Sequence, residues 1–432
     1  MDDSSAKDAE MIDEEMRDVA LDAWNREFGH ERQLTLTVHD PEPITTGKQL
    51  GKGGMGTVHR TDLHGVSLAL KRCWVRRLTS RQLNEIKVLG RISEKRHRHI
   101  VELIGSYTHR RRVGYEVGML IWPVAHTDMA KLFKDLQRLI AFLHVRDGKD
   151  KTNGLNCYMS SLLFIAATDS APYLPTEQSA WELVHACQRR IQRSVGCIAE
   201  AVAHLHLHKI RHKDLKPSQI LLSPNGLWLT DFGWSVDMSE MDNSVTSGGE
   251  IITSKYHAPE RDNRRPCGRA EDIFALGCIY LEMSYAMLRT SGDPTPPWSD
   301  PRSGFSFHGK LKDLDLWIQA LLRLQCNGTM HWYALVRMML SRVDKERPTI
   351  STVLEHIHTT SHSRFRLVDA CCYRTFPKES EEPFLAALPS HEPDIMLHIR
   401  QLIEQQVAKA DSRISSSSWS RLDLNALRAC PD

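Results

Sequence analysis

The stretch from Ile210 to Gly233 constrains this chain most strongly, because it sets charged groups of both signs at short spacings around an apolar hairpin. Asp214 lies two residues before Lys216, and a second carboxylate, Asp231, follows the hairpin. An acidic side chain can orient an attacking hydroxyl group, a cation can offset charge on a moving phosphoryl group, and a second carboxylate can hold a bridging metal ion. The stretch therefore indicates phosphoryl-transfer chemistry.

A glycine-rich segment earlier in the chain predicts a turn that covers phosphate groups. Residues 51–58 read Gly-Lys-Gly-Gly-Met-Gly-Thr-Val, and glycines lack the Cβ that would keep the backbone away from phosphate. The same G-x-G-x-x-G string occurs in dinucleotide-dependent enzymes, where a helix follows the glycines. Here the flanking residues predict strands at 44–52, 56–61 and 66–72. An antiparallel sheet is therefore favoured, and a dinucleotide-dependent enzyme is the alternative that a preference for NAD over ATP would support.

Together with these glycines, His212-Lys213-Asp214 and Asp231-Phe232-Gly233 resemble the catalytic motifs of the eukaryotic protein kinases. Asp-Leu-Lys-Pro at 214–217, with Thr253 ahead of Tyr256, is similar to the serine/threonine branch. The resemblance implies an α+β, bilobal protein-kinase-like fold with a small antiparallel β lobe and a larger, mainly helical lobe. It also implies transfer of the γ-phosphoryl group of ATP to a protein hydroxyl, with ATP and Mg²⁺ as cofactors.

The resemblance assigns roles to individual charged residues. Asp214 would act on the substrate hydroxyl and Lys216 on the γ-phosphoryl group, as the catalytic pair. Lys71, at the end of the third predicted strand, would grip the inner phosphates and pair with Glu85 on a helix expected at 80–92. Asp231 would hold the metal ion.

Further residues are expected to contact the nucleotide. Segment 119–125 looks like the strand and hinge between the lobes, with Ile121 at the gatekeeper position. Backbone groups of Trp122 and Val124 would meet the adenine edge, and Asp128 would meet the ribose. The ATP-binding set implied by the resemblance is Gly51, Lys52, Gly53, Gly56, Val58, Ala69, Lys71, Trp122, Val124 and Asp128.

Three more charged residues are expected to be structural, because buried carboxylates need partners. The resemblance implies that Glu260 pairs with Arg347 and that Asp272 holds the backbone of the catalytic loop. The hydroxyl-rich segment 231–260 resembles an activation segment, in which an added phosphate would be paired by nearby cations.

Two positions depart from the family pattern. Lys213 stands where the family carries arginine, and it keeps the charge but loses the planar fork that pairs a phosphate. Gln219 stands where the family carries its metal-binding asparagine, and its extra methylene and torsion disturb an octahedral Mg²⁺ site. Weakened activity is therefore expected of an enzyme. The alternative is a pseudokinase scaffold that binds ATP weakly or without turnover.

The pattern divides the chain into a kinase domain and two extensions. The acidic start is expected to be a solvated, partly helical and partly disordered tail, and a docked regulatory segment is the alternative. The segment at 146–176 matches nothing in the family core and is expected to be an insertion. The divisions are a tail at 1–42, a kinase domain at 43–360 with lobes at 43–121 and 126–360, and a C-terminal extension at 361–432 with one helix at 395–407 and a disordered serine run at 415–418.

Composition narrows the partners. A net charge of +2 gives no global reason to expect nucleic acid, and the cationic run at 92–101 is expected to be a solvated loop rather than an RNA site. No stretch approaches about 18 consecutive apolar residues, so no membrane span is expected. The acidic start lacks the apolar core of a secretory signal, which favours the cytoplasm or nucleus. A protein substrate is expected, and the two extensions are candidates for binding a regulatory partner.

Two groups of potential metal ligands are expected not to bind metal. The 10 cysteines lack framework spacing and are expected to be reduced thiols, with Cys371 and Cys372 adjacent rather than spaced for zinc. His204, His206 and His208 lie at the end of a predicted helix, where solvation or capping is the ordinary role.

Overall fold

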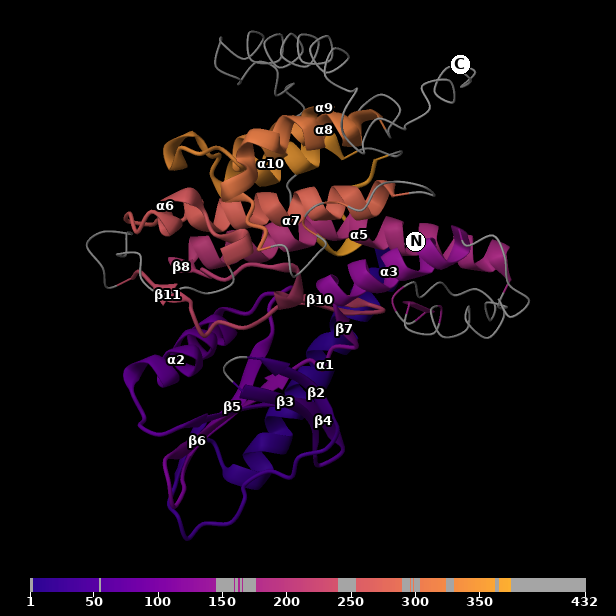
Figure 1. Cartoon of the computed structure of the whole chain (residues 1–432). Coiled ribbons are helices and arrows are strands. Elements are labelled where there is room, and N and C mark those ends of the chain that lie inside the picture. Colours follow the sequence, from indigo (N-terminus) through magenta and orange to yellow (C-terminus); the bar gives the residue numbers. More distant parts are fainter. Residues whose placement is uncertain are drawn as a thin grey trace.

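The computed structural model describes residues 3–53, 56–144, 159, 162–163, 165, 176–239, 254–289, 296, 298, 304–323, 330–361 and 365–373. These residues form a sheet-rich small lobe from the first part of the chain and a larger helical lobe from the rest (Figure 1). The expected α+β, bilobal arrangement is confirmed.

One six-stranded sheet forms the framework of the small lobe, with the spatial order β1-β5-β6-β4-β3-β2. Neighbouring strands are antiparallel except for β1 and β5, which are parallel. His64 and Gly65 join β3 to β4 with φ values of 51° and 84°, the left-handed conformation that a two-residue hairpin requires. Helix α2 (Ser80–Lys95) packs against β5. The strands are β1 Gln33–Leu36, β2 Gln49–Gly53, β3 Gly56–Leu63, β4 Val66–Val75, β5 Glu102–Arg110 and β6 Tyr115–Trp122.

The amino-terminal residues, expected to form a partly disordered tail, instead belong to the small lobe. Helix α1 (Asp3–Phe28) lies against the sheet, and β1 extends the sheet beyond β5. Ala20, Ala23 and Trp24 are at most 2% exposed. The indole of Trp24 packs on Gly105, where an added Cβ would lie 2.4 Å from the ring. The buried face is narrow because two of these three residues are alanines, which explains the weak apolar stripe in the sequence.

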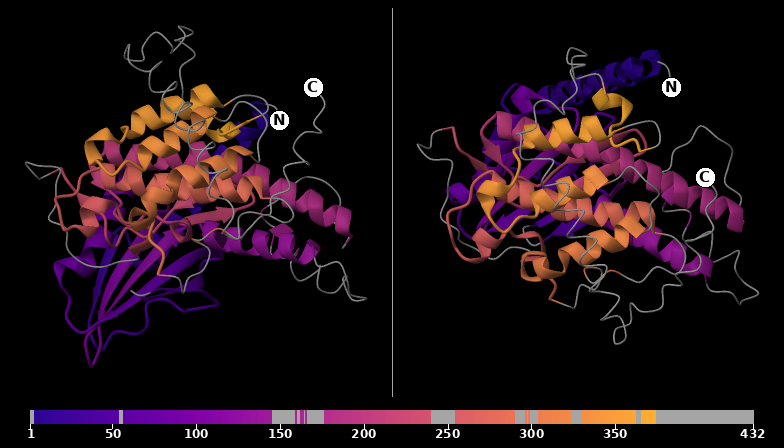
Figure 2. Two further views of the ribbon diagram at one scale, coloured as in Figure 1. Left: turned by 45° about the horizontal axis from the view of Figure 1, so that its top comes forward. Right: turned by 90° about the horizontal axis from the view of Figure 1, so that it is seen from above.

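Two long helices, α5 (Glu177–Leu207) and α7 (Ala270–Leu288), form the centre of the helical lobe. Side chains around nearly the whole circumference of α7 are buried, as expected for a helix inside a large core. Gly277 of α7 allows close packing, because an added Cβ would lie 2.9 Å from the Cβ of Met339. The other helices of this lobe surround this pair (Figure 2) and are α3 Met129–His144, α6 Pro259–Asp262, α8 Leu314–Arg323, α9 Met330–Met339, α10 Ile350–Thr360 and α11 Ala370–Tyr373.

Short strands carry the central motifs at the junction of the lobes. In one small sheet β9 (Ile220–Ser223) lies between β10 (Gly226–Leu229) and β7 (Thr127–Asp128). In another, β8 (Ile210–Arg211) pairs with β11 (Val236–Asp237). Backbone hydrogen bonds from Leu229 N–H to the His99 carbonyl and from Val101 N–H to the Leu229 carbonyl join the α2–β5 connection to β10. The segment that leads out of α2 is thereby fixed to the helical lobe.

Residues 365–373, which belong to the expected C-terminal extension, pack on the helical lobe. Leu367 and Val368 are fully buried. The Gly196 N–H of α5 donates to the Leu367 carbonyl at 2.9 Å. An added Cβ on Gly196 would lie 3.2 Å from Val368 Cγ2, so glycine suits this contact.

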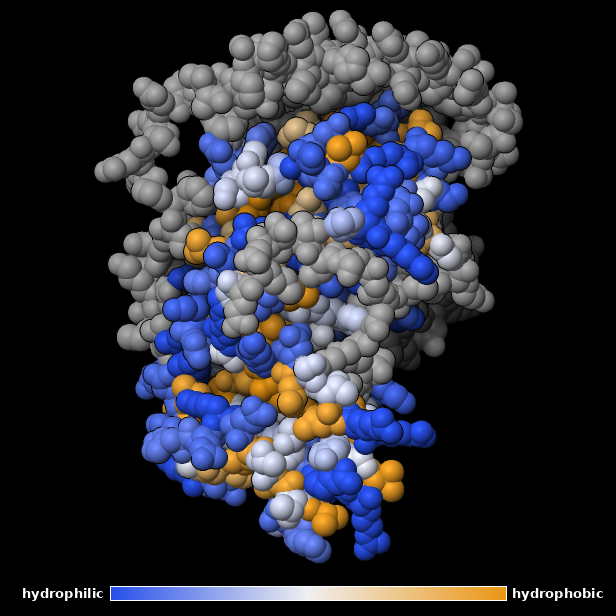
Figure 3. Space-filling view, turned by 90° about the vertical axis from the view of Figure 1, so that its left-hand side faces the viewer, coloured by the Kyte–Doolittle hydropathy of each residue, from blue (hydrophilic) through white to orange (hydrophobic). Residues whose placement is uncertain are grey.

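Several expectations fall outside the described residues. They concern most of the insertion at 146–176, the hydroxyl-rich residues 240–253, the helix at 395–407 and the serine run at 415–418. Across the described helices, none combines the length and the apolar character that a bilayer span needs. On the face seen in Figure 3, hydrophobic side chains show among hydrophilic ones over the small lobe. The exposed large hydrophobic side chains of that lobe include Leu50, Trp74 and Val113.

Candidate active site

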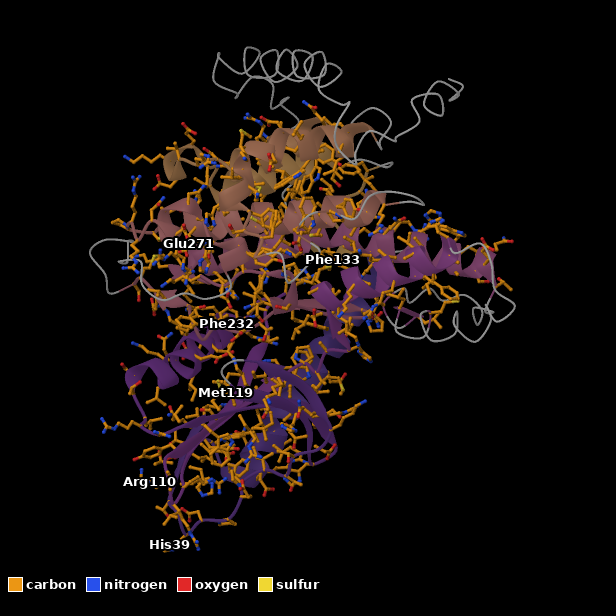
Figure 4. All side chains as sticks on the ribbon, viewed as in Figure 1. His39, Arg110, Met119, Phe133, Phe232 and Glu271 are labelled. Carbon is orange, nitrogen blue, oxygen red and sulfur yellow. The ribbon has the colours of Figure 1, made fainter. Side chains whose placement is uncertain are left out.

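A lysine shared between two carboxylates lies where the lobes meet. Lys71 Nζ of β4 is 2.6 Å from Glu85 Oε1 of α2 and 2.8 Å from Asp231 Oδ1, which follows β10. The expected pairing of Lys71 with Glu85 is therefore present. Asp231 has a φ of 66°, and the next residue, Phe232, is fully buried at the junction of the lobes (Figure 4). These contacts connect the sheet, α2 and the loop after β10.

The pKa values of the two carboxyl groups, Glu85 and Asp231, shift in opposite directions. Burial alone would lower the pKa of Lys71, but Glu85 and Asp231 outweigh burial and raise it. Burial raises the pKa of Glu85 despite its contact with Lys71. Burial also acts to raise the pKa of Asp231, but the charge of Lys71 outweighs burial, so the pKa of Asp231 lies below its ordinary value. Asp231 is therefore an ionised oxygen donor at neutral pH, which is the form that a metal ligand requires.

Asp214 and Lys216, which were expected to be catalytic, are in contact in the loop after β8. Lys216 Nζ donates to Asp214 Oδ2 at 2.6 Å. Asp214 and Lys216 are both largely buried, with side-chain exposures of 7% and 17%. Lys216 also contributes to the lowered pKa of Asp231, so its ammonium group lies within electrostatic reach of that carboxylate. The loop and the shared lysine therefore belong to one site.

The backbone of this loop is held by a buried carboxylate, as expected. Asp272, in the first turn of α7, accepts hydrogen bonds from the backbone N–H of His212 at 2.9 Å and of Lys213 at 2.8 Å. A third comes from His206 Nε2 at 3.0 Å. Burial opposes ionisation, but the His206 hydrogen bond and neighbouring charges lower the pKa of Asp272 to about 2. Lys213 has a φ of 65°, which two bonds to one carboxylate help to maintain.

Arg261 and Glu271, which were not among the residues expected from the sequence, form a buried charged pair that contacts the same loop. Arg261 Nη1 donates to the Lys213 carbonyl at 2.6 Å and to Glu271 Oε1 at 2.7 Å. Burial is the largest cause that lowers the pKa of Lys213. The only signal in the sequence was adjacency, since Arg261 follows Glu260 and Glu271 precedes Asp272.

The expected pair of Glu260 and Arg347 is also present, deep in the helical lobe. Two parallel hydrogen bonds of 2.7 Å join the guanidinium group to the carboxylate. The Arg347 side chain is fully buried and donates in addition to the carbonyls of Ser341 and Ala270. Every part of this charge is thus paired by geometry that favours arginine over lysine.

Gln219 lies against Asp231. Its side-chain Nε2 donates to Asp231 Oδ2 at 2.6 Å. Its backbone is fixed at both ends, because its N–H donates to the Lys216 carbonyl and its carbonyl accepts from Thr230. A carboxylate and an amide oxygen from these two residues are suitable donors for Mg²⁺, provided that the amide turns its oxygen toward the ion. The donor set therefore fits a metal site.

The remaining predicted residues lie around this group. Ala69 and Lys71 point to the same side of β4, because side chains alternate along a strand, and Ile121 of β6 is paired with Ala69. Only glycine suits position 56, where φ is 159° and an added Cβ would lie 2.0 Å from the Arg72 carbonyl oxygen. Asp128 Oδ1 accepts the Lys131 N–H at 2.9 Å and so caps the start of α3. The nucleotide roles of these residues stay predictions.

The remaining ATP-binding candidates occupy the strands and the hinge. Gly51 pairs with Val58, and Gly53 pairs with Gly56, across the β2–β3 hairpin. Added Cβ atoms at Gly51 and Gly53 would meet open space, so a ligand can approach the hairpin from that side. The hinge begins at Trp122, the last residue of β6, and the Trp122–Pro123 peptide bond is cis. Lys52 is exposed in the hairpin, and Val124 lies in the hinge, partly buried against the main core.

Comparison with known proteins agrees with this geometry. The sequence model of the protein kinase domain matches residues 176–358, which lie within the helical lobe. Serine/threonine-protein kinase MPS1 of Encephalitozoon cuniculi is 26% identical over 321 residues, or 72% of this chain and 42% of that protein. Serine/threonine-protein kinase 36 of Pongo abelii is 27% identical over 195 residues, or 43% of this chain and 14% of that protein. Aurora kinase of Yarrowia lipolytica is 23% identical over 307 residues, or 66% of this chain and 65% of that protein.

The chain thus spans less than half the length of the first two relatives. The matched residues include Asp214 and Asp231. The small lobe supplies Lys71 and Glu85, and Lys71 contacts both Glu85 and Asp231. Residues 176–358 therefore match a protein kinase domain, and the chain is similar to serine/threonine protein kinases.

Proposed function

We propose that this chain transfers the γ-phosphoryl group of ATP to serine or threonine hydroxyl groups of a protein. The observation that carries the proposal is the contact of Lys71 with both Glu85 and Asp231. This double contact requires β4, α2 and the loop after β10 to lie close together. The assembled site then has a cation for phosphate, an ionised carboxylate for metal and a separate Asp214–Lys216 pair for chemistry.

Each charged residue has a distinct task in this proposal. Lys71 exchanges its contact with Asp231 for phosphate oxygens of ATP while Glu85 keeps the ammonium group in place. Asp214 accepts the hydrogen bond of the substrate hydroxyl and orients it toward the γ-phosphorus. Lys216 offsets the negative charge on the transferring group. Asp272 keeps the loop backbone at the same position throughout, because both of its loop contacts are to backbone N–H groups.

Asp231 and Gln219 would hold the metal ion. When bound, Mg²⁺ would neutralise part of the charge of the nucleotide phosphates. To supply an oxygen, the Gln219 amide has to turn over, because its N–H faces Asp231 Oδ2. Glutamine also carries one more rotatable bond than asparagine, and Mg²⁺ accepts little error in its ligand distances. Reduced turnover is therefore expected relative to a variant with asparagine.

The same Gln219 contact favours a second candidate function. If the amide keeps its hydrogen bond to Asp231, the carboxylate is less available to a metal ion, and the protein would bind ATP weakly or without turnover, as a scaffold. The two functions differ in one measurable property, which is transfer of phosphate.

The proposal is tested by incubating the purified chain with γ-labelled ATP, Mg²⁺ and a basic protein substrate. Label is expected in serine and threonine with the wild type, and Asp214→Asn is expected to abolish it. Asp18→Asn, a change at an exposed position of α1, controls for a general effect of losing a carboxylate. Equal background label in the wild type and Asp214→Asn would end the enzyme proposal, and ATP binding by calorimetry in those samples would then support the scaffold.

A further inference from the structure

A compact group of sulfur and nitrogen atoms is formed by side chains that have no task in the proposed function. His99 precedes β5, Cys197 lies on α5, and Cys371 and Cys372 lie on α11. One potential ligand atom from each of the four residues lies within 4.8 Å of the others. His99, Cys197 and Cys372 are at most 5% exposed. Three separate parts of the chain thus meet at this group, which we call the Cys3His cluster.

The sulfur–sulfur distances in the Cys3His cluster are close to those of a tetrahedral zinc site. The Sγ atoms of the three cysteines are separated by 3.6, 3.7 and 3.9 Å. Zinc bound to thiolates at about 2.3 Å in tetrahedral geometry requires sulfur atoms about 3.8 Å apart. His99 Nε2 lies 3.0 and 3.6 Å from the Sγ atoms of Cys372 and Cys371, and the same geometry requires about 3.5 Å. Ligand atoms at these separations need only small shifts to enclose one ion.

The tautomer of His99 is the one that a metal ligand needs. His99 Nδ1 lies 3.0 Å from the Leu227 carbonyl oxygen, and because a carbonyl only accepts, Nδ1 carries the hydrogen. In the neutral ring Nε2 then presents its lone pair to the sulfur atoms. A second-shell carbonyl that holds the far nitrogen of a histidine is the usual companion of a zinc-bound imidazole.

The backbone around the Cys3His cluster is fixed by contacts that do not involve the sulfur atoms. Arg98 Nη1 donates to the Cys371 carbonyl at 2.7 Å, and Arg190 Nη1 lies 3.1 Å from Asp369 Oδ2. The bond from Gly196 N–H to Leu367 places the segment beside Cys197. The ligand positions are therefore preorganised.

A disulfide would not account for this arrangement. It would bring two sulfur atoms to about 2.05 Å and leave the third cysteine and His99 outside the bond, whereas the three separations are nearly equal and a histidine nitrogen completes the set. We propose that His99, Cys197, Cys371 and Cys372 bind one Zn²⁺ ion in a closed, structural site. Four protein ligands leave no open position for catalysis.

This site would join the C-terminal segment and α5 to the α2–β5 connection. His99 also accepts a backbone hydrogen bond from Leu229 of β10, so one ion would reinforce the place where the small lobe is attached to the helical lobe. Because α2 carries Glu85, loss of the ion is expected to loosen the attachment of the helix that holds Lys71.

The proposal is tested on the full chain, purified under reducing conditions without chelators, by elemental analysis. About one zinc per chain is expected in the wild type and in Cys187→Ser, a matched control with a cysteine on the same helix that is equally buried. Cys197→Ser and His99→Ala are expected to retain less than about one tenth of that amount. His99→Cys, which keeps four soft ligands, is expected to retain zinc, so it separates loss of a ligand from loss of the fold.

Cobalt provides a second readout that does not depend on any variant. Wild-type protein loaded with Co²⁺ is expected to show thiolate-to-metal charge transfer and the visible absorption of a tetrahedral site. Reduced wild-type protein that contains no zinc and gives no such spectrum on addition of Co²⁺ would overturn the proposal. A disulfide between any two of Cys197, Cys371 and Cys372 in freshly isolated protein, found by mass spectrometry without reduction, would also overturn it.

Discussion

Asp272→Asn is expected to destabilise the protein and to disorder the loop that carries Asp214. The Asp272 carboxylate is 1% exposed and accepts two backbone hydrogen bonds from the loop and one from His206. Asparagine keeps one oxygen and turns an N–H group toward donors that need an acceptor. The change thus removes a charge and leaves at least one buried donor without its bond.

Two independent arguments give the magnitude. A charge-assisted hydrogen bond contributes about 1.5–3 kcal/mol. The pKa of Asp272, lowered from 3.8 to about 2 by the His206 hydrogen bond and nearby charges against the opposing effect of burial, corresponds to about 2 kcal/mol of stability in the ionised form. The expected loss in unfolding free energy at pH 7 is therefore about 2–4 kcal/mol.

The dependence on pH carries a defined sign. Because the pKa of Asp272 is lower in the folded state, its contribution is complete above about pH 4 and is lost as the pH falls through the folded value toward 2. The difference in stability between the wild type and Asp272→Asn should therefore shrink by about 2 kcal/mol over that range.

Urea unfolding of the wild type and Asp272→Asn, measured from pH 7 downward, checks both expectations. Asp315→Asn is the matched control, because Asp315 also lies in the first turn of a helix but its side chain is 40% exposed, so its loss should cost less than about 1 kcal/mol. A variant within about 0.5 kcal/mol of the wild type at pH 7, or a difference that does not shrink in acid, would refute the reasoning.

Contacts elsewhere in the protein give three further predictions. Gln219→Asn is expected to raise the rate of phosphate transfer at low Mg²⁺ concentration by shortening the metal ligand, and steady-state kinetics that match the wild type would show that the glutamine is harmless. Glu260→Ala and Arg347→Met are each expected to lower the free energy of unfolding by about 3–5 kcal/mol, because each change leaves a buried charge without its partner. The double variant is expected to lose less than the sum of the two single losses. Additive losses in urea unfolding would contradict a direct pair. Trp24→Ala is expected to cost about 3–5 kcal/mol and to expose α1 to protease, and unchanged thermal unfolding would show that α1 does not dock.

The charged framework could be predicted from the sequence because the residues that bear it lie in short motifs with fixed spacing. The pairs Lys71–Glu85 and Glu260–Arg347 and the role of Asp272 as a backbone acceptor all appear in the structure. The orientation of the Gln219 amide could not be predicted, because it depends on a hydrogen bond to Asp231 from a neighbouring loop.

The docking of α1 and the Cys3His cluster were not predicted from the sequence, for physical reasons. The start of the chain was expected to be a tail because its buried face consists largely of Ala20 and Ala23, which contribute little to an apolar pattern. The Cys3His cluster was missed because His99 and Cys372 are 273 residues apart, and zinc patterns in sequence are recognised by short spacings between ligand pairs. Only the packing of residues 365–373 on α5 brings them together.

The central claim is that Lys71, Asp231 and the Asp214–Lys216 pair form one phosphoryl-transfer site, and the rate of label transfer from γ-labelled ATP with Mg²⁺ tests it most directly. The wild type is predicted to label a protein substrate, and Asp231→Asn, checked for folding by circular dichroism, is predicted to be at least about 100-fold slower. A folded Asp231→Asn variant that transfers label as fast as the wild type would contradict the claim.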